Sequence, residues 1–173
     1  MESKGLKMIA RKTEVMVNRS GDSEEVIVCD RRGDRLKQVD KFRYLGSIIN
    51  GKGGCSTEVR ERVKAAWCKW REMGGVVCDK KMPALLKAQV YKTVVRPVLV
   101  YAAETWALSK KESELLERTK MRMLRWILGV GRRDRIRNEN IRKRLKVLCI
   151  TEKIRTTRLR WADTQKNLKK KEY

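Results

Sequence analysis

Histidine is absent from this chain of 173 residues. Imidazole is the commonest general base near neutral pH and the commonest zinc ligand in proteins. Its absence excludes a Ser-His-Asp triad, a Cys-His dyad, an HExxH site and a Cys2His2 zinc finger built within the chain. Most of the common enzyme and zinc sites are thereby ruled out.

Cysteines are few, and they are widely scattered along the sequence. No two of them form a CxxC pair, and their odd number fits no disulfide framework. We therefore expect reduced thiols in a nuclear or cytoplasmic protein, and neither disulfides nor a thiolate metal site. The five cysteines are Cys29, Cys55, Cys68, Cys78 and Cys149.

Long apolar runs are also lacking. No stretch approaches the roughly 18 uninterrupted apolar residues of a membrane-spanning helix, and residues 1–4 lack the apolar segment of a signal peptide. We expect no membrane partner and no secretion, so the sequon Asn18-Arg19-Ser20 should carry no glycan.

Two weak matches to catalytic or cofactor sites remain. Residues 46–53 nearly match a phosphate-binding P-loop, but Gly53 stands where a hydroxyl would hold Mg²⁺, and Ile48 and Ile49 are typical of a strand. Asp30 and Asp34 are the nearest pair of carboxylates for two-metal chemistry, but intervening arginines compete with a metal. We therefore predict no catalytic residue, no metal, no cofactor and no enzyme activity.

Positive charge is what the chain has in excess. Lys and Arg number 44 against 21 Asp and Glu, a net charge of +23. Residues 51–173 hold 33 basic and 13 acidic side chains, a net charge of +20. Such an excess repels itself in a compact monomer, and nucleic acid is the commonest polyanion that relieves it. We expect this region to bind RNA, DNA or a hybrid, mainly through the backbone.

The hydrophobic pattern changes from β-like to helical near residue 54. Short β-rich runs between residues 14 and 49, joined by Gly and Asp turns, predict a small antiparallel sheet. Apolar residues then recur about every 3.6 positions, which predicts helices. The expected fold is α+β and mostly α. Its expected divisions are a β subdomain (1–54), a helical bundle (55–130), a basic helical hairpin (131–165) and a disordered tail (166–173).

Several residues predict where helices begin and end. Ser109 and Glu112 have the spacing of a capping box, and Gly129 is a natural C-terminal stop. Pro97 should break or kink a helix, and Thr151 should cap the last one. The last two helices fit an ordinary αα-hairpin or a helix-turn-helix.

Basic residues are interleaved with tryptophans on these helices. Arginine contacts phosphates as a fork and stacks on bases, although a solvated helix face explains many individual arginines. We predict Trp67, Trp70 and Trp126 in the core, and Trp161 either in the core or as a stacking surface. The candidate binding residues are Arg122, Arg125, Arg132, Arg133, Arg135, Arg137, Arg142, Lys143, Arg158, Arg160 and Trp161.

Short motifs follow one another along residues 5–161. They include Lys12-Thr13-Glu14-Val15-Met16, Phe42-Arg43-Tyr44-Leu45-Gly46-Ser47, Met121-Arg122-Met123-Leu124-Arg125-Trp126 and Arg158-Leu159-Arg160-Trp161. In order and spacing they resemble the C-terminal part of reverse transcriptases from LINE-type retrotransposons, which lack long terminal repeats. The resemblance implies an end-of-palm β subdomain, a thumb and a basic segment. It places Lys12 near the nucleotide site, and Tyr44 and Gly46 near the primer terminus.

The sequence also departs from that family. Ile9 stands where the family usually has Asn, Ala102 where it usually has Gly, and a Gly-His element is missing after Trp161. The family's palm Asp-Asp motif would precede Met1, so the resemblance implies a truncated, catalytically inactive fragment of an RNA-directed DNA polymerase. A sheet edge left bare by the missing palm should favour self-association. The alternatives are an expressed relic or structural protein without nucleic-acid function, and a helix-turn-helix DNA-binding regulator.

Overall fold

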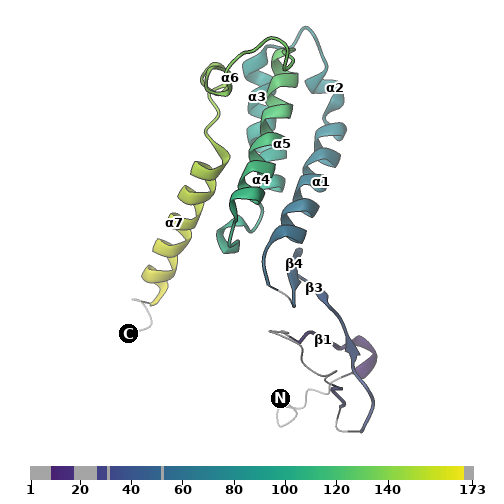
Figure 1. Cartoon of the computed structure of the whole chain (residues 1–173). Helices are drawn as coiled ribbons and strands as arrows, with labels where there is room; N and C mark the ends of the chain where they lie inside the picture. The colour runs from purple at the N-terminus through teal and green to yellow at the C-terminus, as the bar shows by residue number, and fades with distance from the viewer. Residues whose placement is uncertain (1–8, 18–26, 31, 52, 170–173) are drawn as a thin grey trace. The chain divides into compact units, whose positions relative to one another are not determined.

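A computed structural model describes residues 9–17, 27–30, 32–51 and 53–169 of the chain (Figure 1). The chain divides into two units, residues 1–58 and 59–173, and the boundary falls inside helix α1. Strands occur in the first unit and most helices in the second. The fold is α+β and mostly α, as predicted from the sequence.

The first unit contains two short strand pairs. Strand β3 (Lys41–Tyr44) pairs antiparallel with β4 (Ser47–Asn50), which confirms the predicted antiparallel strands. Strand β1 (Glu14–Val15) instead pairs parallel with β2 (Lys37–Gln38). The sequence did not predict this direction, because alternation of side chains is the same in parallel and antiparallel strands. The 3-10 turn η2 (Ala10–Lys12) precedes β1.

The β3–β4 turn consists of Leu45 and Gly46, which both have positive φ, at 47° and 83°. Two such residues form the type I′ turn, whose twist matches that of the strands it joins. The Ile48 amide then donates a 2.6 Å hydrogen bond to the carboxylate of Glu58, a 3% exposed residue in the first turn of α1. Residues 46–50 are thus a turn and a strand, and the strand predicted in place of a phosphate-binding loop is confirmed.

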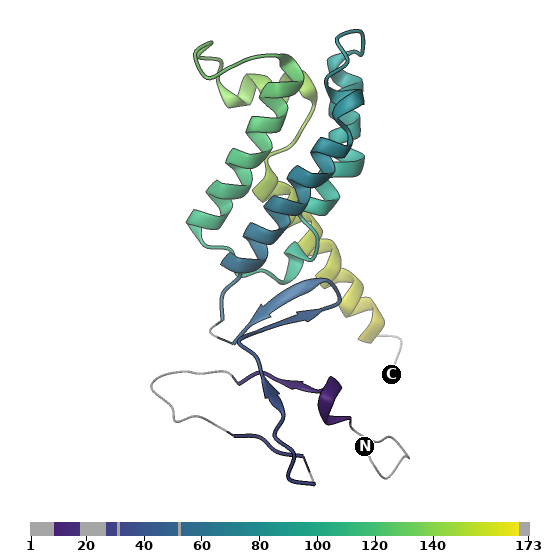
Figure 2. The same cartoon turned by 90° about the vertical axis from the view of Figure 1, so that its right-hand side faces the viewer.

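The second unit is helical, and α5 lies at its centre. Helix α5 packs on α3, α6 and α7, and Figure 2 shows the yellow α7 diverging from it toward the C-terminal end. The elements are α1 (Ser56–Glu72), α2 (Gly74–Val77), α3 (Ala84–Val90), the π-helical segment η3 (Tyr91–Val95), α4 (Arg96–Leu99), η4 (Ala103–Thr105), α5 (Lys110–Leu128), α6 (Asn138–Leu145) and α7 (Ile150–Lys169).

Pro97 explains the π-helical segment. Proline has no N–H to donate to the carbonyl four residues earlier, and its ring clashes with that carbonyl. The chain widens instead, and the Arg96 amide bonds the Tyr91 carbonyl five residues back. The predicted disturbance at Pro97 therefore occurs in the turn before it, and helical backbone continues through Leu99.

Buried apolar side chains from each of the helices α1 to α7 form the core of this unit. Leu116, Met123 and Leu124 of α5 are fully buried, as their spacing predicted. The spacing of apolar residues over 84–95 favours Leu86, Val90 and Val94 as the inward face, but the buried residues of α3 and η3 include Ala88, Tyr91 and Val95, and Leu86 is 50% exposed. This difference is already present in α3, before the π-helical segment, because helical spacing shows which residues share a face but not which face is covered.

Two helix ends differ from the predictions. Helix α7 begins at Ile150, so Thr151 lies inside its first turn and does not cap it. The same helix continues to Lys169, into the segment predicted as a tail, because residues 150–169 contain no Gly or Pro to end it.

Removing the cap of α5 should destabilise the second unit. The Ser109 hydroxyl accepts the Glu112 amide, and the Glu112 carboxylate accepts the Ser109 amide at 2.6 Å, which confirms the predicted capping box. We expect Ser109→Ala to lower the free energy of unfolding by about 1 kcal/mol. Urea denaturation measures this free energy. Because the two hydrogen bonds act together, Glu112→Ala should lower the free energy of unfolding less in the Ser109→Ala background than in the unaltered chain. Full additivity of the two losses would contradict a capping box.

Candidate nucleic-acid interface

A basic groove runs along the exposed side of α5. It encloses about 390 Å³ between α5 and the chain that follows it. Four arginines and two glutamates give its walls a net charge of +2, which favours an anionic ligand. We name it the α5 groove, and its lining residues are Glu114, Glu117, Arg118, Met121, Arg122, Arg125, Arg132 and Asn138.

Arg125 fastens the loop that closes one side of this groove. Its guanidinium donates to the carbonyl oxygens of Gly131 at 2.9 Å and Ile136 at 2.7 Å, and to the Asn138 side-chain oxygen at 3.1 Å. The planar fork of arginine suits such a set of acceptors. Arg125 was predicted from the sequence to be a binding residue. In the structure its N–H donors hold residues 131–138 together.

The loop between α5 and α6 has a defined fold of its own. Gly129 ends α5 with φ of 65°, as predicted, and the Asp134 carboxylate accepts the Gly131 amide at 2.7 Å. The Arg135 amide bonds the Arg132 carbonyl, and Arg135 has φ of 51°. Neither Asp134 nor Asn138 caps α6: Asp134 binds the Gly131 amide, and Arg137 occupies the cap position without a side-chain bond.

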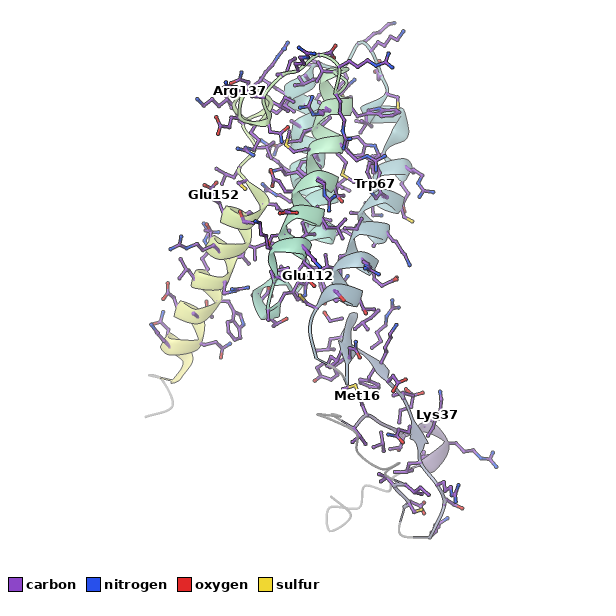
Figure 3. The ribbon with its side chains drawn as sticks, viewed as in Figure 1. Met16, Lys37, Trp67, Glu112, Arg137 and Glu152 are labelled. Carbon is purple, nitrogen blue, oxygen red and sulfur yellow. The ribbon has the colours of Figure 1, made fainter. Side chains whose placement is uncertain are left out.

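Four of the predicted binding residues lie on this loop, with exposed side chains. Figure 3 shows Arg137 at the opposite end of the helical unit from Glu112. Within the described part of the chain, none of the four guanidinium groups pairs with a carboxylate, so all four can meet an anion from outside. We call residues 131–137 the arginine loop, after Arg132, Arg133, Arg135 and Arg137.

Arg122 lines the groove and contacts a tryptophan of α1. The Arg122 guanidinium lies over the Trp67 ring, 5.4 Å from its centroid, and Trp67 packs edge-on against Trp70. Trp70 is buried as predicted. Trp126 is 62% exposed, so the prediction that it belongs to the core was wrong. Trp126 shares the helical spacing of the apolar residues of α5, but its side of the helix is not covered by another described helix.

A partly buried cluster of charges adjoins the groove through Glu117, and it was not predicted from the sequence. Glu117 forms ion pairs with Lys120 at 2.7 Å and Arg142 at 3.0 Å, and accepts the Ile150 amide at 3.2 Å. Lys120 is 1% exposed and also donates to the Leu148 carbonyl at 3.3 Å. The signal available in the sequence was a Glu and a Lys three residues apart beside the apolar stripe of α5. Arg142 thus joins α6 to α5.

The pKa values in this cluster reflect burial and pairing. Burial raises the pKa of Glu117, but the hydrogen bond and charge of Lys120, with the Ile150 amide and Arg142, lower it below its ordinary value overall. Burial lowers the pKa of Lys120, and Glu117 only partly offsets this. The cluster is therefore stabilised with Glu117 ionised.

The remaining predicted residues of the second unit are spread over α6 and α7. Lys143 lies with Arg142 in a second, shallower depression of about 480 Å³. Arg158 donates to the Trp106 carbonyl at 2.7 Å and so fixes α7 to the end of η4. Arg160 is exposed, and Trp161 is 49% exposed. They do not gather with the arginine loop into one site.

The first unit holds the three other predicted residues. Lys12 is the exposed last residue of η2, Tyr44 is a 57% exposed residue at the end of β3, and Gly46 completes the hairpin turn. No helix of the described chain is both long and apolar enough to cross a membrane. The described residues also include no cluster of three or more Cys, Asp or Glu side chains suited to a metal ion.

The structure gives no particular support to a helix-turn-helix. Helix α6 packs mainly on α5 and α3, whereas α7 packs mainly on α5 and η4. A helix-turn-helix instead places two helices across one another, with the second free to enter the major groove.

Comparison with known proteins gives one similarity at the level of sequence. The chain matches no protein-family model and no solved structure. It is 28% identical over 166 residues to an uncharacterised, transposon-derived protein of Caenorhabditis elegans. The alignment covers 91% of this chain and 58% of that protein, so the chain spans little more than half of the relative's length.

Proposed function

We propose that the chain is a transposon-derived, thumb-like module of a LINE-type reverse transcriptase, and that it holds the backbone of RNA or DNA without catalysing a reaction. The observation that carries the proposal is the arginine loop, which presents four guanidinium groups on a folded scaffold. Similarity to a transposon-derived protein and the order of the sequence motifs support the origin.

The arginine loop suits a phosphate backbone better than a small anion. Its four side chains are exposed, follow one another within six residues and adjoin the positively charged α5 groove. Arginine forks bind phosphate oxygens in pairs, and such contacts position a nucleic acid without reading its sequence. The proposed partner is therefore RNA, DNA or a hybrid, in the nucleus or the cytoplasm.

Salt-dependent binding tests this proposal. Fluorescence anisotropy of labelled single-stranded, duplex and hybrid oligonucleotides with the full chain gives an affinity at each salt concentration. Each phosphate neutralised on a duplex contributes about −0.9 to the slope of log affinity against log salt. Replacing Arg132, Arg133, Arg135 and Arg137 together by alanine should make that slope shallower by about 3 to 4 units.

A matched variant separates specific contacts from net charge. Lys80, Lys81, Lys110 and Lys111 are also exposed, so changing all four to alanine removes the same charge from elsewhere on the second unit. We expect this control to change the slope by less than about one unit. Equal effects of the two variants would reject the arginine loop as the binding site, and no binding by the unaltered chain would favour the relic.

A further inference from the structure

We infer that Trp126 and the α5 groove form a contact site for single-stranded nucleic acid. An unpaired base would stack on the Trp126 indole while adjoining phosphates lie against the groove arginines. The inference rests on the proposed function and narrows it from nucleic acid in general to single strands.

Trp126 is the most exposed tryptophan of this unit, ahead of Trp161 at 49%. It is 62% exposed in the last turn of α5, whereas Trp70 and Trp106 are 6% and 5% exposed. Indole is the largest apolar side chain, and most of its area is normally removed from water. An exposed indole ring has a flat face available to a planar ligand. The charge of the residues on the same side of α5 indicates the kind of ligand.

Two arginines lie on the same side of α5 as Trp126. Arg122 and Arg118 precede Trp126 by four and eight residues, so all three lie along one side of the helix. Successive members are separated by about 6 Å along the helix axis. A nucleotide whose base covers the indole therefore has its phosphate within reach of a guanidinium. Both arginines line the α5 groove, which also includes Arg132 of the arginine loop.

Arg122 is held in place for such a contact. Its guanidinium lies 5.4 Å from the centroid of the Trp67 ring. A cation–π contact fixes the position of the group without an acceptor oxygen. Among the described residues no carboxylate pairs with Arg122, so its N–H donors are available to a phosphate.

Base stacking should distinguish single strands from duplexes. In a duplex each base is already stacked between its neighbours, so its face is closed to an indole. A single strand offers the face of every base, and stacking on an aromatic side chain tolerates any sequence. Phosphates are available in both forms, so the groove and the arginine loop contribute to either. The preference for single strands should therefore depend on Trp126.

The test compares Trp126→Ala and Trp126→Phe with the unaltered full chain, on oligothymidine and on a duplex of the same length. We expect Trp126→Ala to weaken single-strand binding about tenfold and Trp126→Phe to weaken it less. Duplex affinity should change by less than about twofold, and the salt slope should not change. Leu85→Ala, which removes a 52% exposed apolar side chain from α3, should change neither the single-strand affinity nor the duplex affinity.

Tryptophan fluorescence supplies a second readout. Oligothymidine should quench the emission of the unaltered chain more than that of Trp126→Phe, because stacking brings a base onto the indole. This comparison needs only the conservative variant, so it decides the matter even if Trp126→Ala unfolds. Unchanged quenching and unchanged single-strand affinity in Trp126→Phe and Trp126→Ala, with salt-dependent binding intact, would overturn the single-strand site and leave the proposed function standing. If the unaltered chain binds neither ligand, both proposals fail.

Discussion

Replacing Glu117 by glutamine should lower the free energy of unfolding by about 3 kcal/mol, because it leaves a buried lysine without its counter-charge. Lys120 is 1% exposed, and it also donates a hydrogen bond to the Leu148 carbonyl at 3.3 Å. The same change removes the 3.0 Å ion pair with Arg142 that joins α6 to α5. Urea denaturation followed by far-UV circular dichroism measures the loss.

Glu114→Gln is the matched control for this variant. Glu114 lies three residues earlier on α5 and is exposed, so its loss should change the free energy of unfolding by less than about 0.5 kcal/mol. Combining Glu117→Gln with Lys120→Met removes both charges of the pair and should recover a large part of the loss. If the double variant is no more stable than Glu117→Gln alone, the cost does not come from an unpaired lysine.

The same carboxylate predicts how stability depends on pH. The pKa of Glu117 is lowered in the folded chain, from an ordinary value of 4.5, so the unfolded chain takes up its proton first as the pH falls. The stabilisation is therefore complete above about pH 5 and is lost as the pH falls through the folded-state pKa. Glu117→Gln should reduce the acid sensitivity of the free energy of unfolding between pH 5 and pH 3. An identical pH profile in the variant would contradict this assignment.

Replacing Arg125 by methionine should loosen the arginine loop and lower the free energy of unfolding by about 2 kcal/mol. The variant keeps the length of the side chain but loses the donors to Gly131, Ile136 and Asn138. Arg125→Lys should restore little of the lost free energy of unfolding, because an ammonium group cannot reproduce the planar fork of a guanidinium. Hydrogen exchange at the amides of residues 131–138 should become faster in both variants.

Nucleic-acid binding then separates a positioning role for Arg125 from a direct phosphate contact. If Arg125 only positions the loop, Arg125→Met should weaken binding while the salt slope stays the same. A direct contact would make the slope shallower by about one unit. Arg155→Met removes an equal charge from an exposed position on α7 and should leave the loop's hydrogen exchange unchanged. A similar increase in exchange for Arg155→Met would show that the effect is one of charge alone.

Features fixed by neighbouring residues were predicted from the sequence. The capping box of Ser109 and Glu112, the Gly129 stop and the β3–β4 hairpin each depend on residues a few positions apart. The parallel β1–β2 pair joins Glu14 to Lys37, 23 positions away, and no local pattern specifies such a partner. The exposure of Trp126 was missed because helical spacing shows which residues share a stripe but not which stripe another helix covers.

The candidate site was predicted only in part, for a similar reason. The excess of arginine was evident from the sequence. The structure shows which of these arginines already donate hydrogen bonds to acceptors within the chain and which do not. Arg125, Arg142 and Arg158 bond acceptors within the chain, whereas the four exposed arginines of the loop do not pair with a carboxylate of the described residues. A sequence gives the number of charges, and only the packing decides which of them remain available.

The way Arg125 holds the arginine loop has a consequence for how the loop can evolve. Two of its three acceptors are backbone carbonyls, which every amino acid possesses. Residues such as Arg132, Arg133 and Arg137 can therefore mutate without removing the bonds that shape the loop. Selection could vary the number of positive charges one at a time on a constant backbone, so affinity for a polyanion could change widely between variants of this sequence that share one fold.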